Sequence, residues 1–178
     1  MTYKALVSLS GGMDSATVLS ECVKTHGKDK VLAVHCFYGA KHGPYERVMA
    51  RELANHYGVS LRVLSMENMF RDFNSALISH SDTPIPEGHY EAESMKQTVV
   101  PARNLIFIST LSGLANSLGA KELWVGVHAG DRAIYPDCRP EFISSAENTV
   151  RLALGDSNFS LITPFLFSTK SQILSCGL

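Results

Sequence analysis

Residues 5–15 read A-L-V-S-L-S-G-G-M-D-S, and this stretch decides the fold class. The run Ala5–Leu9 is apolar at nearly every position, as is typical of a parallel strand buried on both faces. Two glycines then interrupt the strand. A helical pattern of apolar residues follows Asp14 and ends at Gly27, a residue type that commonly closes helices. A strand, a glycine turn and a helix in this order predict the first unit of an α/β fold.

The same alternation continues along the chain. Apolar runs and helical periods predict four more strands and three full helices. The strands are expected at Val31–Phe37, Val59–Met66, Leu123–Val127 and Ser160–Ile162, and the helices at Tyr45–Tyr57, Asn104–Leu118 and Phe142–Leu154. We therefore expect one domain over residues 1–178, a Rossmann-like, doubly wound five-stranded parallel sheet flanked by helices. Its ligand site should lie at the carboxyl ends of the strands.

Two segments depart from this regular pattern. Residues 67–100 are rich in turn residues and too long for a plain connection, so we expect a binding loop or lid there. A helix cap at residues 168–171 leaves only a short, truncated helix before residue 178. The helix at Tyr45–Tyr57 carries five residues on one apolar face, Tyr45, Val48, Met49, Leu53 and Tyr57, which predicts that this face is the buried one.

Composition narrows the class of protein. The 178 residues hold 16 Lys and Arg against 17 Asp and Glu, a net charge of −1, which argues against a basic nucleic-acid-binding module. The longest uncharged apolar stretch, residues 105–120, is shorter than a membrane span. The four cysteines are widely spaced and form no C-x-x-C pair, so we expect reduced thiols and no metal site. We expect a cytoplasmic protein that contacts neither membrane nor nucleic acid.

The segment Ser10–Ser15 is the strongest chemical signal. Its glycines allow a tight turn that presents backbone N–H groups, its serines add hydroxyls, and the following helix points its positive end at the same place. These features predict a nest for a phosphate or pyrophosphate. The segment has neither a Walker A pattern nor G-x-G-x-x-G. The alternative is an ordinary glycine turn with Asp14 as a helix cap.

Two further segments lie beyond predicted strands. Pro101-Ala102-Arg103-Asn104 opens a helix, and an arginine at that end can neutralise phosphate charge. Residues 126–142 read G-V-H-A-G-D-R-A-I-Y-P-D-C-R-P-E-F, a polar loop that predicts either a binding site or a structural turn held by its prolines. Four residues flank the end of the predicted second strand: His35, Tyr38, Lys41 and His42. They are either site residues or ordinary surface and capping residues.

The hexapeptide S-G-G-M-D-S resembles the PP-loop of the ATP pyrophosphatases. Taken with the other two segments in this order, it resembles the 7-cyano-7-deazaguanine synthase family, whose pattern near G-V-x-x-x-D-x-x-x-Y-P-D-C-R-x-E-F is matched without a gap. The resemblance implies an adenine nucleotide alpha hydrolase-like fold. Members commonly carry glycine at the position of Ala102, a mild change unless the backbone there needs a positive φ. Members also continue into a zinc-binding tail with four cysteines, whose ligands are absent here.

The resemblance implies an ATP-dependent conversion of 7-carboxy-7-deazaguanine and ammonia to 7-cyano-7-deazaguanine through an adenylated intermediate, with Mg²⁺. It implies catalytic roles for Asp14, Ser15 and Arg103. The ATP-binding candidates that it implies lie in the glycine turn, in the first turns of the following helix and in the segment that opens with Pro101: Leu9, Ser10, Gly11, Gly12, Met13, Asp14, Ser15, Ala16, Thr17, Val18, Leu19, Arg103 and Asn104. The substrate-binding candidates are the polar and aromatic residues of the later loop: Asp131, Tyr135, Asp137, Arg139, Glu141 and Phe142.

Two other functions remain open at this point. A tRNA-thiolating enzyme of the same superfamily would need reactive cysteines, commonly paired, and a basic surface, and the sequence offers neither. A catalytically impaired nucleotide-binding remnant would fit the missing tail. The sequence also leaves open whether the chain forms a homodimer.

Overall fold

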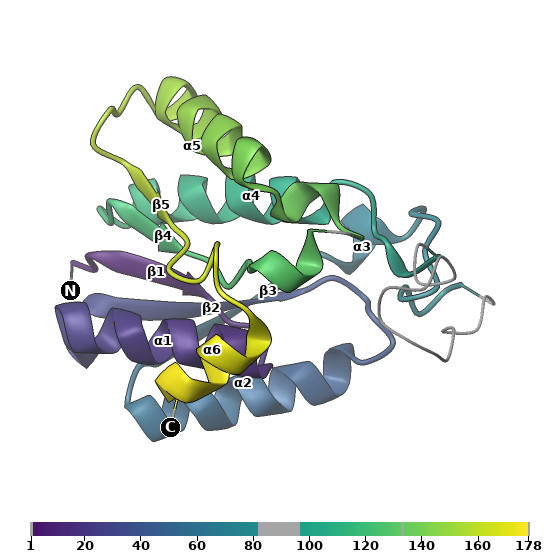
Figure 1. Ribbon diagram of the computed structural model, residues 1–178, viewed down its shortest axis with the longest axis horizontal. Helices are drawn as coiled ribbons and strands as arrows, with labels where there is room; N and C mark the ends of the chain where they lie inside the picture. The colour runs from purple at the N-terminus through teal and green to yellow at the C-terminus, as the bar shows by residue number, and fades with distance from the viewer. Residues whose placement is uncertain (1, 82–96, 133, 178) are drawn as a thin grey trace.

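The computed structural model describes residues 2–81, 97–132 and 134–177, and it contains one five-stranded parallel sheet between two layers of helices (Figure 1). All of its neighbouring strands pair in parallel, and their order is β3-β2-β1-β4-β5. The strands are β1 Ala5–Ser8, β2 Val31–Phe37, β3 Ser60–Ser65, β4 Glu122–Trp124 and β5 Ser160–Ile162. This topology confirms the fold class predicted from the sequence.

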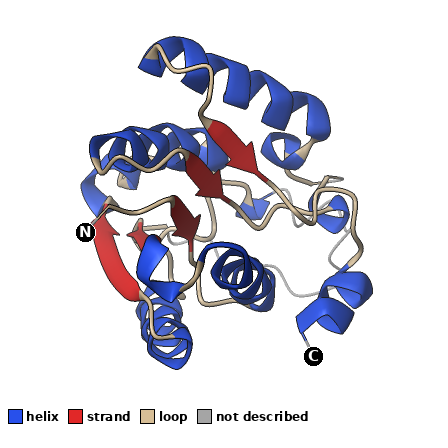
Figure 2. Cartoon of the chain, turned by 90° about the vertical axis from the view of Figure 1, so that its left-hand side faces the viewer, coloured by secondary structure: helices blue, strands red, loops and turns tan. Residues whose placement is uncertain are grey.

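The helices divide between the two faces of the sheet (Figures 1 and 2). One face carries α1 Met13–His26, α2 Gly43–Tyr57 and α6 Lys170–Gly177, and the other carries α4 Arg103–Ser117 and α5 Pro140–Leu154. The remaining elements are short helical turns: η1 Lys28–Lys30, α3 Glu67–Phe70, η3 Ala129–Asp131 and η4 Pro136–Cys138. None of the described helices is long and apolar enough to cross a membrane.

The core consists of two apolar clusters, one on each side of the sheet. β1 supplies both, because successive side chains on a strand point to opposite faces. Ala5 and Val7 pack toward α1 and α2, whereas Leu6 packs toward α4 and α5, and all three are fully buried. The unbroken apolar run that predicted a central strand is thus explained by helices covering both faces.

The buried face of α2 differs in part from the prediction. The helix begins at Gly43, two residues earlier than expected, and it buries Ala50 and Ala54, while the predicted Leu53 and Tyr57 are partly buried against the core. Tyr45, Val48 and Met49 are all exposed, by 76%, 56% and 49%. The reason is close packing, since only small side chains fit where this helix lies against the sheet and the turn after β1.

The region expected to be a loop or lid is well packed where it is described. Phe70, Ala76 and Ile78 are buried, and Ile78 forms an antiparallel bridge with Ala40 after β2. The backbone N–H of Ala76 donates to the carbonyl of Gln97 at 2.8 Å, which joins the two ends of the segment. Residues 82–96 of this predicted lid lie outside the described part of the chain.

A strained backbone precedes α4. Ala102 has φ 55° and ψ 22°, the left-handed conformation, and it is the only residue other than glycine with a positive φ in the described ranges. The position where related sequences commonly carry glycine therefore does need a positive φ. An L-residue with a Cβ pays about 1–2 kcal/mol in this conformation, and here the strain lies directly beside Arg103.

We predict that Ala102→Gly stabilises the protein. Relief of the left-handed strain exceeds the added entropy of the unfolded chain, so the gain should be about 0.5–1 kcal/mol. For a domain of this size, that gain raises the midpoint of thermal unfolding by roughly 1–4 °C. Ala153→Gly, at an exposed position in α5, is the matched control and should lower the midpoint. A lower midpoint for Ala102→Gly would contradict the prediction.

Candidate active site

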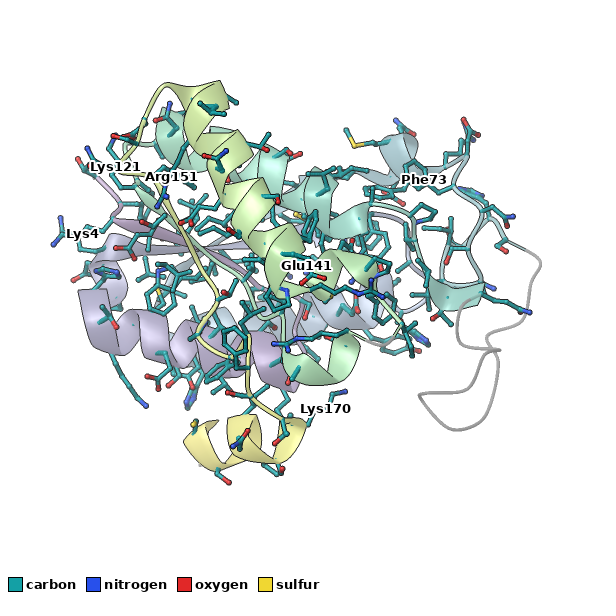
Figure 3. All side chains as sticks on the ribbon, turned by 45° about the horizontal axis from the view of Figure 1, so that its top comes forward. Lys4, Phe73, Lys121, Glu141, Arg151 and Lys170 are labelled. Atoms are coloured by element: carbon teal, nitrogen blue, oxygen red, sulfur yellow. The ribbon has the colours of Figure 1, made fainter. Side chains whose placement is uncertain are left out.

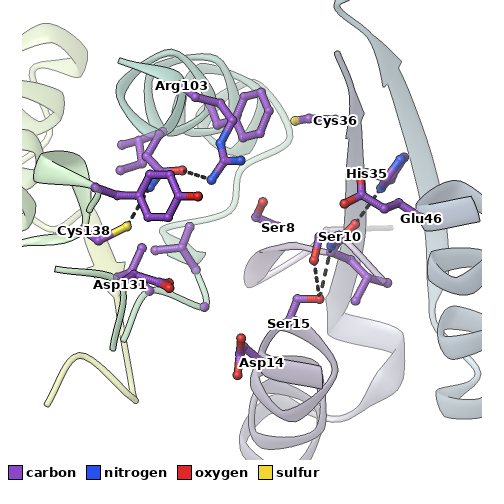
Figure 4. A pocket seen from close by; sticks show the side chains of 18 of the residues that line it. Ser8, Ser10, Asp14, Ser15, His35, Cys36, Glu46, Arg103, Asp131 and Cys138 are labelled. Carbon is purple, nitrogen blue, oxygen red and sulfur yellow. Dashed lines mark hydrogen bonds between the residues drawn. The ribbon is translucent and has the colours of Figure 1, made fainter. Parts of the chain in front are cut away.

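A pocket of about 390 Å³ opens at the carboxyl ends of β1, β2 and β4 (Figure 4). Ligands of doubly wound sheets bind at this edge of the sheet. Its walls come from five parts of the chain: the turn after β1, the end of β2 with the first turn of α2, the start of α4, the loop after β4, and the start of α6. The three sequence motifs therefore meet at one cavity.

Hydrogen bonds of two serines stabilise the turn between β1 and α1. The hydroxyl oxygens of Ser10 and Ser15 lie 3.0 Å apart, and the Ser15 hydroxyl donates to the carbonyl of Gly12 at 3.0 Å. The backbone N–H of Ser10 donates to the Ser15 oxygen at 3.2 Å. Gly12 is the N-cap of α1, and no side chain caps this helix start. Asp14 therefore is not a cap, and the first N–H groups of α1 have no side-chain cap.

Gly11 allows this turn to lie against α2. Its φ is 93°, and a Cβ added there would come within 2.6 Å of the carbonyl oxygen of Glu46 and 2.9 Å of the Met49 Cβ. No other residue fits, because both the backbone conformation and the available space require glycine. The contact also brings Glu46 to the pocket wall.

Arg103 lies on the opposite side of the pocket from the serine turn (Figure 4). Its guanidinium lies over the rings of Tyr38 and Phe107 and makes a long hydrogen bond, 3.5 Å, to the Tyr38 hydroxyl. Its Nε is buried without a hydrogen-bond partner. Burial lowers the pKa of Arg103, but the nearby Tyr38 and the carboxylate of Asp137 raise it more, so the net shift is upward. The group is a partly buried cation with a spare donor at Nε, suited to an anionic ligand.

The loop after β4 supplies two of its predicted residues to the pocket. Asp131 and Tyr135 both line it, and the Tyr135 hydroxyl lies 3.1 Å from the Thr98 hydroxyl. Asp137 instead faces the start of α4, where its Oδ2 accepts the backbone N–H of Asn104 at 2.9 Å. The Asn104 side chain also donates to the Asp137 carbonyl at 3.2 Å. These two bonds from Asn104 to Asp137 fix the helix end that carries Arg103.

The other predicted residues lie away from the cavity. Arg139 donates to the carbonyl of Arg132 on an exposed surface, Glu141 is exposed at the start of α5, and Phe142 packs against the core (Figure 3). Within α1, Val18 and Leu19 are fully buried in the core, and Thr17 donates to the carbonyl of Met13. Among the loop residues, Leu9, Ser10, Asp14 and Ser15 line the pocket.

Several pocket residues were not predicted from sequence. Glu46 and Phe107 reach the cavity from helices, and Lys170 reaches it from the start of α6. His35, left open by the sequence, is 1% exposed, and its Nδ1 lies 2.9 Å from the carbonyl of Leu9. His128 was missed altogether and is equally buried. The only signal for it was its position directly after the fourth strand.

The cysteines show no sign of nucleophilic or metal chemistry. Cys36 and Cys138 line the pocket, and burial raises the pKa of each thiol to about 12. Both thiols therefore stay protonated near neutral pH. In the described ranges, no group of three or more His, Cys, Asp or Glu side chains could hold a metal ion, so we derive no step through zinc.

Comparisons with known proteins agree with the predicted family. The family described as queuosine biosynthesis protein QueC matches residues 4–178. A 7-cyano-7-deazaguanine synthase of Marinomonas sp. strain MWYL1 is 42% identical over 100% of this chain and 79% of the relative. The synthase of Pseudoalteromonas translucida is 39% identical with the same coverage.

A solved structure resembles the fold. The NH3-dependent NAD synthetase of Campylobacter jejuni, in complex with the nitrate ion, aligns with a TM-score of 0.58 at 16% identity. The alignment covers 99% of this chain and 63% of that protein, and at this identity it supports the fold alone. The match over nearly the whole chain and the two relatives, together with the meeting of three motifs at one pocket, lead to one conclusion. The chain belongs to the family of the queuosine biosynthesis protein QueC.

Proposed function

We propose that this protein converts 7-carboxy-7-deazaguanine and ammonia to 7-cyano-7-deazaguanine and cleaves ATP to AMP and pyrophosphate. The names of the relatives support the reaction. The observation that carries it is one pocket in which an uncapped helix start, without a Walker lysine, faces a partly buried arginine. Such a site suits the binding of a pyrophosphate leaving group.

The chemistry explains why ATP is cleaved between its α and β phosphates. A carboxylate is a poor acyl donor, because its leaving group would be oxide. Attack of the carboxylate oxygen on the α-phosphorus releases pyrophosphate and forms an acyl-adenylate, from which ammonia displaces AMP to give the amide. A second adenylation, on the amide oxygen, releases another pyrophosphate. Loss of AMP and a proton then leaves the nitrile.

The chain's residues act by position and charge. The amides at the start of α1 and the hydroxyls of Ser10 and Ser15 would bind pyrophosphate, and Arg103 would balance the charge that develops on it. Asp14 fits a role in holding Mg²⁺, since its Oδ1 is buried without a hydrogen-bond partner and Mg²⁺ favours one or two carboxylates plus phosphate oxygens. When bound, that ion would neutralise phosphate charge.

For the deazaguanine, the proposal favours Asp131 and Tyr135 over the other loop candidates. Both line the pocket, where a carboxylate can accept from the ring's N–H groups and an aromatic ring can stack on the base. The hydrogen bond from Asn104 to Asp137 favours a supporting role for that carboxylate.

The pocket favours this reaction over the rival functions. A thiolating enzyme needs an ionisable thiol, whereas the pKa of Cys36 and Cys138 is raised to about 12 by burial. A degenerate remnant would not be expected to retain an aligned serine turn, a partly buried arginine with a spare donor and a helix cap that positions it.

The products of ATP cleavage test the proposal. With 7-carboxy-7-deazaguanine and ammonia present, chromatography should show AMP and pyrophosphate, and formation of ADP would contradict the reaction. Asp14→Ala should raise the activation free energy of AMP release by about 2–4 kcal/mol, as expected for the loss of one preorganised electrostatic group. Asp29→Ala, in the exposed turn η1, is the matched control and should leave the rate unchanged.

Substrate recognition gives a second prediction. With the analogue of the acid that lacks the 2-amino group, the enzyme should release AMP much more slowly. The acceptor atoms of the pocket would then lose the N–H donor that the 2-amino group supplies. Asp131→Asn should raise KM for the acid more than KM for ATP. Asp137→Asn should not produce this difference between the two KM values, and it should lower the midpoint of thermal unfolding, since it weakens the bond to the N–H of Asn104. The reverse pattern would assign base reading to Asp137.

We also propose a homodimer, supported by the exposed apolar face of α2. Tyr45, Val48 and Met49 lie one turn apart and are each about half exposed or more, which is unusual for a face left in water. Sedimentation should show a dimer for the natural chain and a monomer for Val48→Glu. Leu152→Glu, at an exposed apolar position on α5, serves as the control. A natural chain that sediments as a monomer at micromolar concentration would refute the dimer.

A further inference from the structure

His128 is a fully buried histidine that touches two carboxylates of the pocket. It is 1% exposed, and it directly precedes the turn η3 in the loop after β4. Its Nε2 lies 3.3 Å from Oδ2 of Asp131 and 3.5 Å from Oδ2 of Asp14. Asp14 belongs to the serine turn and Asp131 to the later loop, and both line the pocket (Figure 4). One side chain thus bridges the two motifs.

The backbone fixes which nitrogen of the ring carries the proton. The N–H of Gly130 donates to Nδ1 of His128 at 3.0 Å. Since a backbone N–H can only donate, Nδ1 must be an acceptor, and the proton of the neutral ring sits on Nε2. The ring also lies against the backbone of Gly130, where an added Cβ would come within 2.9 Å of its Cε1. Its single N–H therefore sits on the nitrogen that lies nearest the two carboxylates.

The bond that this N–H should make is incomplete. Nε2 of His128 and Oδ1 of Asp14 are both buried, and neither has a hydrogen-bond partner with good geometry. A buried polar atom left without a partner costs about 1–3 kcal/mol. A small movement of either carboxylate toward Nε2 would complete the bond. The two loops are close enough for this, since a Cβ on Gly126 would lie 3.3 Å from the backbone nitrogen of Ser15.

We propose that His128 is a positioning residue whose Nε2–H holds the carboxylates of Asp14 and Asp131 together, and so couples the ATP-binding turn to the substrate loop. The coupling rests on the proposed function. Without this donor, the two carboxylates would face each other as like charges in a partly buried place, which drives them apart. Asp131 would then move away from the pocket, and the acid would bind in the wrong register for attack on the α-phosphorus.

Two substitutions of His128 test the roles of its two ring nitrogens separately. His128→Asn keeps an acceptor at the position of Nδ1 for the Gly130 N–H but has no donor that reaches the carboxylates. His128→Gln has an amide N–H as many bonds from Cα as Nε2 and keeps that donor. We expect His128→Asn to lose roughly 10- to 100-fold in kcat/KM for AMP release, as for a misplaced substrate, and His128→Gln to recover most of it. His56→Asn, on the exposed end of α2, is the control.

Thermal unfolding gives a readout that does not need activity. Asp131→Asn should lower the midpoint in the natural chain, where it weakens the contact to Nε2. It should raise the midpoint in the His128→Asn background, where it removes the repulsion. Full activity for His128→Asn, equal losses for both variants, or the same sign of the Asp131→Asn effect in both backgrounds would overturn the proposal. If the natural chain releases no AMP with the acid, the proposed reaction fails, while this reversal of sign still tests His128.

Discussion

The close approach of the turn after β1 to the first turn of α2 is the constraint on which the site depends. At Gly11 the backbone is left-handed and a Cβ would meet the Glu46 carbonyl at 2.6 Å. This contact sets where the uncapped start of α1 points, and it places Glu46 on the pocket wall. It also explains why α2 buries alanines, since the helix must come within backbone distance of the turn.

The sequence predicted the parts of the structure that depend on neighbouring residues. The strand, glycine turn and helix at residues 5–26 are a local pattern, and the parallel sheet follows from repeating it. The buried face of α2 could not be predicted this way. Its apolar pattern pointed to Tyr45, Val48 and Met49, but the space left by Gly11 accepts only small side chains, and that space is a property of the assembled fold.

The candidate site, like the fold, could be predicted from the sequence only in part. The loop serines, Arg103, Asp131 and Tyr135 were identified because they belong to motifs, and the structure brings them to one cavity. Asp137 belongs to the same motif but faces the N–H of Asn104, a distinction that depends on side-chain direction and not on residue type. Glu46, Lys170 and His128 lie in segments whose patterns did not single them out, and only the folded chain brings them to the pocket or its carboxylates.

The pocket is also where the described structure leaves polar groups unsatisfied. Six buried side-chain atoms lack a hydrogen-bond partner, and four of them belong to Asp14, His35, Arg103 and His128. Three of these residues line the pocket, and the fourth contacts two carboxylates that do. Each such atom destabilises the unliganded fold by about 1–3 kcal/mol. A ligand with anionic oxygens and ring N–H groups supplies partners for donors and acceptors alike, so binding recovers free energy that folding gave up. The strained Ala102 beside Arg103 follows the same logic, because strain and unmet hydrogen bonds persist where the surrounding fold holds groups ready for a ligand.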